Sequence, residues 1–185
     1  MPAVAVSHGG EMWVCEGMTK TLDRSDILEW AEHEHAHMDR LFQDLRETFA
    51  RIAASDVSDA QAREAVDQAV DDLRGALDDM LEHFNEEEEV YFVAIEGRFP
   101  ELGPQVARLV HTHESICRKV KRMTHQLAKP LPQVREEVKG LSTQLDELVV
   151  TLEDHNEEEQ VIFATALKRL SSDERVELLD KKMAL

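Results

Sequence analysis

Two stretches of the sequence, about seventy residues apart, each place a histidine and a glutamate four positions apart. The first stretch contains His83 and Glu87, and the second contains His155 and Glu159. Residues four apart lie one turn above each other on the same face of an α-helix, so each pair directs an imidazole and a carboxylate at one spot. The spacing therefore predicts long helices, each with a polar face that could bind a metal ion.

A single pair would carry little weight, because 39 residues of this chain are acidic. One histidine on a solvated acidic helix face is the simpler explanation of one pair. Here the pattern occurs twice, and both copies follow apolar runs and lead into aromatic residues, namely Tyr91, Phe92 and Phe163. We therefore interpret the two pairs as two halves of one buried metal site.

The composition favours an all-α fold and excludes some classes of partner. The chain has 185 residues but only 7 glycines and 5 prolines, and only 5% of its residues are aromatic. Long runs of Ala, Leu, Glu, Asp and Arg are typical of helices. The formal charge of −18 repels phosphate backbones and anionic membranes and attracts cations. We expect no nucleic-acid partner and no membrane association.

The cysteines and the first residues indicate the compartment. Cys15 and Cys117 form no CxxC motif and no disulfide-rich pattern. Residues 1–10 have no basic region followed by an apolar run, so they do not resemble a signal peptide, and no later segment approaches the ~20 apolar residues of a membrane span. We expect a soluble cytoplasmic protein.

Apolar residues at helical spacing, separated by capping and turn residues, predict four long helices. Short connections require neighbouring helices to run antiparallel, which gives an up-down-up-down four-helix bundle. Ser171–Glu174 would cap a short terminal helix that runs to about residue 183. We expect an irregular N-terminal arm over 1–24 and one bundle domain over 25–185, with long helices over about 26–54, 59–96, 104–128 and 132–170.

The heights of the candidate ligands along these helices agree. His83 and Glu87 precede the turn near residue 100 by about as many positions as His113 follows it. At ~1.5 Å per residue, all three lie roughly 20 Å from that turn. His155 and Glu159 fall at a matching height on the last helix, as does a histidine cluster on the first. All four helices therefore deliver a candidate ligand to one layer.

The first helix offers three histidines, His33, His35 and His37, which cannot all point inward, because residues two apart diverge by about 200° on a helix. His35 shares the apolar side best, being three residues before Met38 and seven before Phe42. His35 is the expected ligand, and His37 is the main alternative.

The third helix offers His111 and His113. His113 shares a face with apolar residues and is the expected inward side chain. Cys117, one turn beyond it, is interpreted as a small core residue, with a role beside the metal or as an extra ligand as the alternative. His8 and His125 have no helical partner pattern and are expected on the surface.

These motifs resemble those of the hemerythrin-like HHE cation-binding domain. The similarity covers about residues 26–170, and Glu34–Leu41 and His83–Glu87 are the segments most similar to the motifs of the family. The resemblance implies an oxo- or hydroxo-bridged pair of iron ions, with an open position for dioxygen, nitric oxide or peroxide. It also implies two bridging carboxylates and four imidazoles, from Glu87, Glu159, His35, His83, His113 and His155.

Two departures from the oxygen-carrying members of that family are visible. Those members carry two histidines four apart on the third helix, whereas Leu109 and Cys117 flank His113 here. Two octahedral irons have about twelve positions, so this chain would leave about two open, which is closer to the bacterial relatives that resemble iron-centre repair proteins. Also, Phe92 follows His83 by nine residues and Phe163 follows His155 by eight. Glu158 is therefore an alternative to Glu159.

Imidazole and carboxylate suit manganese and zinc as well as iron, and more than one function fits the pattern. The leading expectation is a protein that binds or reacts with a small oxidant and acts in sensing, storage or protection. Weak peroxidase, catalase or oxidase activity is an option. The alternatives are an iron donor for repair of iron-sulfur centres, and a metal-free or zinc-bound helical adaptor. Aromatic residues could line a gas pocket or belong to the plain core (Trp30, Phe42, Phe84, Tyr91), and Trp13 and Cys15 could form a lid.

Overall fold

The computed structural model describes residues 25–175 and 177, with side chains described at 38, 40–175 and 177. The expected arm over 1–24 and the end of the short terminal helix lie outside the described residues. In the described part the chain is helical, without strands: α1 (Ser25–Ala53), α2 (Asp59–Glu86), the π-helix η1 (Glu87–Phe92), α3 (Val93–Arg98), the 3₁₀-helix η2 (Pro100–Leu102), α4 (Gly103–Leu127) and α5 (Leu131–Arg169).

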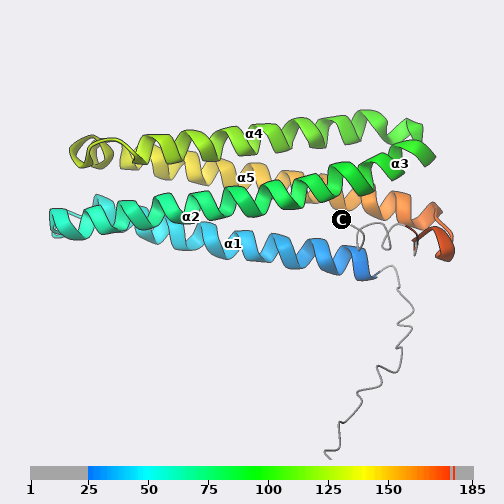
Figure 1. Cartoon of the computed structure of the whole chain (residues 1–185), viewed down its shortest axis with the longest axis horizontal. Helices are drawn as coiled ribbons and strands as arrows, with labels where there is room; N and C mark the ends of the chain where they lie inside the picture. Colours follow the sequence, from blue (N-terminus) through cyan, green and yellow to red (C-terminus); the bar gives the residue numbers. More distant parts are fainter. Residues whose placement is uncertain (1–24, 176, 178–185) are drawn as a thin grey trace, which may run out of the picture.

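The long helices form the expected four-helix bundle (Figure 1). Successive helices run in opposite directions, and α3 continues the line of α2. Helix α1 packs against α2 and α5, and α4 packs against the same two helices on the other side. The all-α, up-down-up-down prediction is therefore confirmed for the described residues.

Local capping explains where two helices begin. The Ser58 side chain accepts from the backbone N–H of Gln61, and the Gln61 side chain caps the N–H of Ser58, which is a complete capping box at the start of α2. The same reciprocal arrangement joins Ser171 and Glu174 at the predicted start of the terminal helix. The capping role of Ser171–Glu174 was predicted from the sequence.

The single helix predicted over 59–96 is wrong in one respect, because a π-helical turn interrupts it over Glu87–Phe92. A π-turn accommodates one extra residue within an otherwise α-helical rod. This extra residue explains why Phe92 is nine residues after His83, while Phe163 is eight after His155. Both phenylalanines are buried at 2% exposure in the same apolar cluster. The helix also continues through Gly97 to Arg98, since no described glycine has a positive φ that would end it.

The buried side chains form two apolar clusters along the bundle. The larger cluster fills the end of the bundle where α1 connects to α2 and α4 connects to α5. The smaller cluster lies around η1, α3, η2 and the adjoining parts of α4 and α5. Between them lies a layer of buried polar side chains from α2, η1, α4 and α5, which we call the polar layer: His83, Glu87, His113, His155 and Glu159.

Candidate metal centre

The two histidine–glutamate pairs, His83 with Glu87 and His155 with Glu159, have the geometry that their spacing predicts. His83 Nε2 lies 2.9 Å from Glu87 Oε1, and His155 Nε2 lies 3.8 Å from Glu159 Oε2. In each pair the two residues are one helical turn apart, so the backbone places both side chains on the inner face. Each pair presents one nitrogen and one oxygen donor to the middle of the bundle.

Contacts between the helices close the site. His113 Nε2, from α4, lies 3.1 Å from His155 Nε2 and 3.3 Å from Glu87 Oε2. Two groups of three side chains offer ligand atoms that all lie within 4.8 Å of one another: Glu87, His113 and His155 form one group, and His83, Glu87 and Glu159 form the other. Glu87 belongs to both, which is the arrangement that a carboxylate bridging two ions requires.

The burial of this layer argues that a cation belongs there. Glu87 and Glu159 are 0% exposed, and the three imidazoles are at most 8% exposed. Burying two ionised carboxylates close together is costly, because each loses its hydration and they repel each other, unless a positive group compensates them. Imidazole nitrogen and carboxylate oxygen are ligands suited to iron, manganese and zinc. The donor set therefore fits a pair of such ions.

The two carboxylates differ in their protonation. Burial and the charge of Glu87 raise the pKa of Glu159 well above its ordinary value. Burial also opposes the ionisation of Glu87, but the close imidazoles of His113 and His83 outweigh this cost and hold the pKa of Glu87 well below its ordinary range. Of the two carboxyl groups, Glu159 therefore holds a proton more strongly and Glu87 is the more readily ionised.

Aromatic rings enclose His113. The ring of Phe84 stacks on it with centroids 3.8 Å apart and an angle of 5°, and the ring of Phe92 lies 5.9 Å away at 17°. Phe84 also meets His155 edge-on at 5.9 Å. Phe84 was expected near the site, whereas Phe92 was not considered as a wall. Tyr91 and Phe42 are buried in the two separate apolar clusters.

Glu88 is a functional candidate that sequence reasoning missed. Its Oε1 lies 2.7 Å from Nδ1 of His113, on the side of the imidazole that faces away from the polar layer. Its position within a run of four glutamates hides it, because that run looks like a solvated helix face. The contact with Nδ1 of His113 distinguishes Glu88 from Glu87, which faces Nε2 of the same ring, and from the exposed Glu89.

The structure distinguishes the members of two pairs of candidate ligands. Glu159 is fully buried in the polar layer, whereas the side chain of Glu158 is 37% exposed and forms an ion pair with Arg108 of α4. His113 is buried, while the side chain of His111 is 77% exposed. The lost register that made Glu158 an alternative is accounted for by the π-turn in the first copy.

Cys117 lies in the larger apolar cluster at 8% exposure, and burial raises the pKa of its thiol. Among the described side chains, the groups that could hold a metal do not include it. This placement agrees with the simpler interpretation of a core residue. His125 is exposed, as expected, and His8 lies outside the described residues.

The histidines of the first helix are placed only by their backbone. His35 and His37 belong to α1, but their side chains, and that of Trp30, lie outside the described residues. Trp13 and Cys15 lie outside the described residues altogether. The choice between His35 and His37 therefore stays a prediction.

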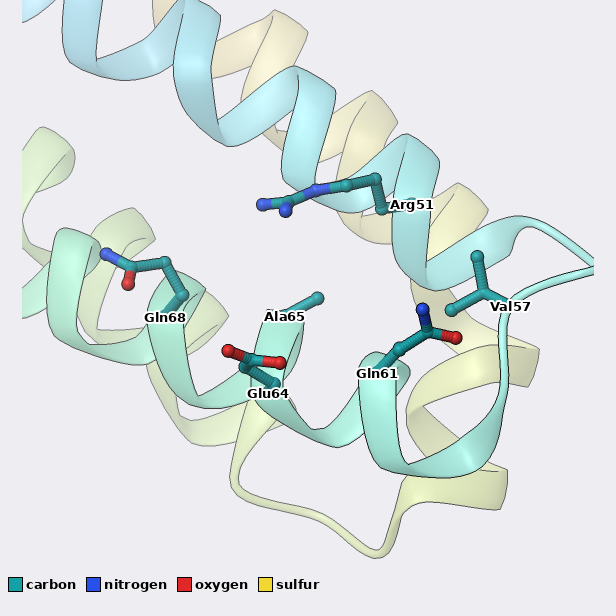
Figure 2. A pocket seen from close by; sticks show the side chains of 6 residues that line it. All are labelled: Arg51, Val57, Gln61, Glu64, Ala65 and Gln68. Atoms are coloured by element: carbon teal, nitrogen blue, oxygen red, sulfur yellow. The ribbon is translucent and has the colours of Figure 1, made fainter.

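A groove of about 470 Å³ lies near the α1–α2 connection (Figure 2). The guanidinium of Arg51 extends over it from α1, and Gln61, Glu64 and Gln68 face it from α2. The nearest of these, Gln68, precedes His83 by fifteen residues, or roughly 22 Å along the helix. The groove is separate from the polar layer, and its polar lining residues are exposed.

Comparison with known proteins identifies the family. The family model for the Hemerythrin HHE cation binding domain matches residues 26–167, which contain all five described members of the polar layer. Neither a curated protein nor a solved structure matches the chain. Among the described helices, none combines the length and the apolar composition that crossing a membrane requires. The chain belongs to the hemerythrin HHE cation-binding domain family.

Proposed function

We propose that this chain is a non-haem di-iron protein that binds or reacts with dioxygen, nitric oxide or peroxide, in sensing, storage or protection. The observation that carries the proposal is the pair of three-residue groups that share Glu87 in a buried layer. One group supplies two imidazoles and one carboxylate, and the other supplies one imidazole and two carboxylates. A metal pair is favoured over a single ion, because one ion rarely needs two facing carboxylates.

In this proposal the ligands are His83, Glu87, His113, His155 and Glu159, with His35 added from α1. Such a set fills about ten of the roughly twelve positions of two octahedral ions when an oxo or hydroxo bridge is counted for two. When bound, an iron pair supplies one-electron and two-electron chemistry toward a small oxidant at an open position. Manganese or zinc would fit the same donors.

The protein would control access to that centre by excluding water. Phe84 and Phe92 lie nearly parallel to the ring of His113, and both apolar clusters border the polar layer. A small uncharged molecule loses little hydration on entering such surroundings, whereas an anion loses much. The net charge of −18 also favours uptake of cations over anions.

The test combines metal content with a spectrum. We expect about two irons per chain after aerobic purification, and near-ultraviolet absorption bands of an oxo-bridged pair that change when nitric oxide or peroxide is added. A colourless chain that takes up no iron, manganese or zinc would contradict the proposal and favour a helical adaptor. Zinc alone, with no response to oxidants, would indicate a structural role.

A second function, donation of iron for repair of iron-sulfur centres, is favoured by the residues beside His113. Leu109 is fully buried in one apolar cluster and Cys117 lies in the other, so His113 is the one imidazole that α4 contributes to the polar layer. Fewer protein ligands would hold iron less tightly. Transfer of iron from the loaded protein to a metal-free iron-sulfur protein, in the presence of sulfide and a reductant, would support this function. Retention of iron under those conditions would exclude it.

A further inference from the structure

The imidazole of His113 needs a fixed orientation to serve as a ligand. A neutral imidazole has one protonated nitrogen and one nitrogen with a free lone pair, and only the second can bind a metal. The ring is 2% exposed, so water cannot fix this choice. Some neighbouring group in the protein must decide which nitrogen faces the polar layer with its lone pair.

The two nitrogens of this ring have different neighbours. Nε2 faces the polar layer, 3.1 Å from His155 Nε2 and 3.3 Å from Glu87 Oε2. Nδ1 faces Glu88, whose Oε1 lies at 2.7 Å. An ionised carboxylate can only accept a hydrogen bond, so Nδ1 must carry the proton of this contact. When an ion is bound between Nε2 and Glu87, the single proton of the neutral ring is therefore on Nδ1, and the lone pair of Nε2 is left for the ion.

We propose that Glu88 is a positioning residue of the metal centre. By accepting the Nδ1–H of His113, it holds the imidazole in the tautomer and the rotation that direct Nε2 at the ion shared with Glu87 and His155. A carboxylate in this place also makes Nε2 a stronger donor, because it stabilises positive charge that develops on the ring. This inference rests on the proposed metal site.

The contact is specific to one glutamate of the run. Glu87 points into the polar layer and is fully buried, Glu88 is 35% exposed at its side chain, and Glu89 is exposed. In the second copy of the motif, the position after the buried glutamate is Gln160, which is exposed. The positioning carboxylate therefore belongs to the first copy alone among the described residues.

The opposing explanation is an ordinary ion pair at the rim of the bundle, which would contribute little. Three variants of the full chain separate the two explanations: Glu88→Ala removes the acceptor, Glu88→Gln keeps a neutral acceptor, and Glu89→Ala removes a neighbouring exposed charge as the matched control. The probes are Co²⁺ and Fe²⁺, each titrated in competition with a chelator.

We expect Glu88→Ala to weaken binding of Co²⁺ by about 10- to 100-fold, Glu88→Gln to weaken it less, and Glu89→Ala to leave it within about two-fold. The proton spectrum of the Co²⁺ form gives a readout that a structural role would not move. Metal-bound histidines show shifted, exchangeable ring N–H signals, and the signal of His113 should be lost or exchange faster in Glu88→Ala. The metal-free variants should unfold at nearly the urea concentration of the wild type.

The outcomes that contradict the inference are distinct from those that contradict the proposed function. A wild-type chain that takes up neither Co²⁺ nor Fe²⁺ would overturn the metal site itself. A wild-type chain that loads normally, together with a Glu88→Ala variant of equal affinity and unchanged ring N–H signals, would overturn only the role of Glu88. Equal losses in Glu88→Ala and Glu89→Ala would also overturn it, since they would reflect general charge.

Discussion

The ring of Phe84 lies flat against the imidazole of His113, with 3.8 Å between centroids and 5° between planes. Both residues are buried, and they come from neighbouring helices, α2 and α4. The stack joins the larger apolar cluster to the polar layer, so the packing of the core and the orientation of a candidate ligand depend on the same side chain.

Replacing Phe84 by alanine should therefore affect both stability and metal binding. We expect a loss of about 3–5 kcal/mol in the free energy of unfolding of the metal-free protein, as for other buried phenylalanines, and at least a ten-fold loss of metal affinity. Phe49→Ala is the matched control, because Phe49 is fully buried in the same cluster but lies outside the polar layer. It should cost similar stability in urea unfolding and leave metal affinity unchanged; equal effects on affinity would contradict the role of the stack.

Glu87 and Glu159 should differ when each is changed to glutamine. Glu87 belongs to both three-residue groups, whereas Glu159 belongs to one. We expect Glu87→Gln to lower the affinity for both ions by more than the 10- to 100-fold that is typical of residues hydrogen-bonded to metal ligands. Glu159→Gln should retain one ion. Metal content per chain after dialysis measures this. Glu158→Gln is the control and should retain both; a loss there equal to that of Glu159→Gln would show that the inward glutamate has been misassigned.

The contribution of Glu159 to the stability of the metal-free protein should decrease as the pH rises above about 4.3. The pKa of Glu159 is raised well above its ordinary value by burial and by the charge of Glu87. The folded state therefore holds a proton that the unfolded chain releases from about pH 4.3 upward, so the free energy of unfolding decreases between that pH and the raised pKa. Glu87 has the opposite sign, and its contribution is lost only as the pH falls below about 4.3.

Urea unfolding at a series of pH values, with a chelator present, measures this dependence. Glu159→Gln should be less sensitive to pH than the wild type above about pH 4.3, and an identical slope would contradict the assignment. Zn²⁺ should stabilise the wild type more as the pH rises, because the ion displaces the proton of Glu159 on binding.

The π-turn predicts the effect of a deletion. Residues 86–89 are four consecutive glutamates, so removing any one of them gives the same chain, in which His83 precedes the phenylalanine by eight residues, as in the second copy. We expect a continuous α-helix that still buries Phe92, with a cost of about 1–2 kcal/mol in urea unfolding. Deletion of Asp79 is the control. It shifts the polar layer itself against the upstream core and should cost more than about 3 kcal/mol.

Substitution can decide between His35 and His37, the two candidate ligands of α1. We expect His35→Ala to lower metal affinity by at least ten-fold, because His35 shares the apolar side of the helix, and His37→Ala to have an effect within about two-fold. Chelator competition with Co²⁺ measures both. The reverse order would assign the ligand to His37.

Spacing alone predicted much of this molecule. The apolar periodicity and the capping segments located the four long helices to within a few residues, and the i, i+4 pairs predicted that His83 with Glu87 and His155 with Glu159 would share faces. These predictions succeed because the α-helix is set by local hydrogen bonds, whose period is the same wherever the sequence permits it. The family resemblance was carried by the same local motifs and is confirmed over residues 26–167.

Other features depended on packing between helices. The sequence showed that the two copies differ by one residue, but it could not tell whether the difference moves Glu159 or is absorbed elsewhere. In the folded bundle a π-turn absorbs it over Glu87–Phe92, because this keeps Phe92 buried beside Phe163. The contact of Glu88 with His113 likewise joins residues 25 apart on two helices. Local spacing determines which residues share a helix face, and only the tertiary structure decides which atoms of the next helix that face meets.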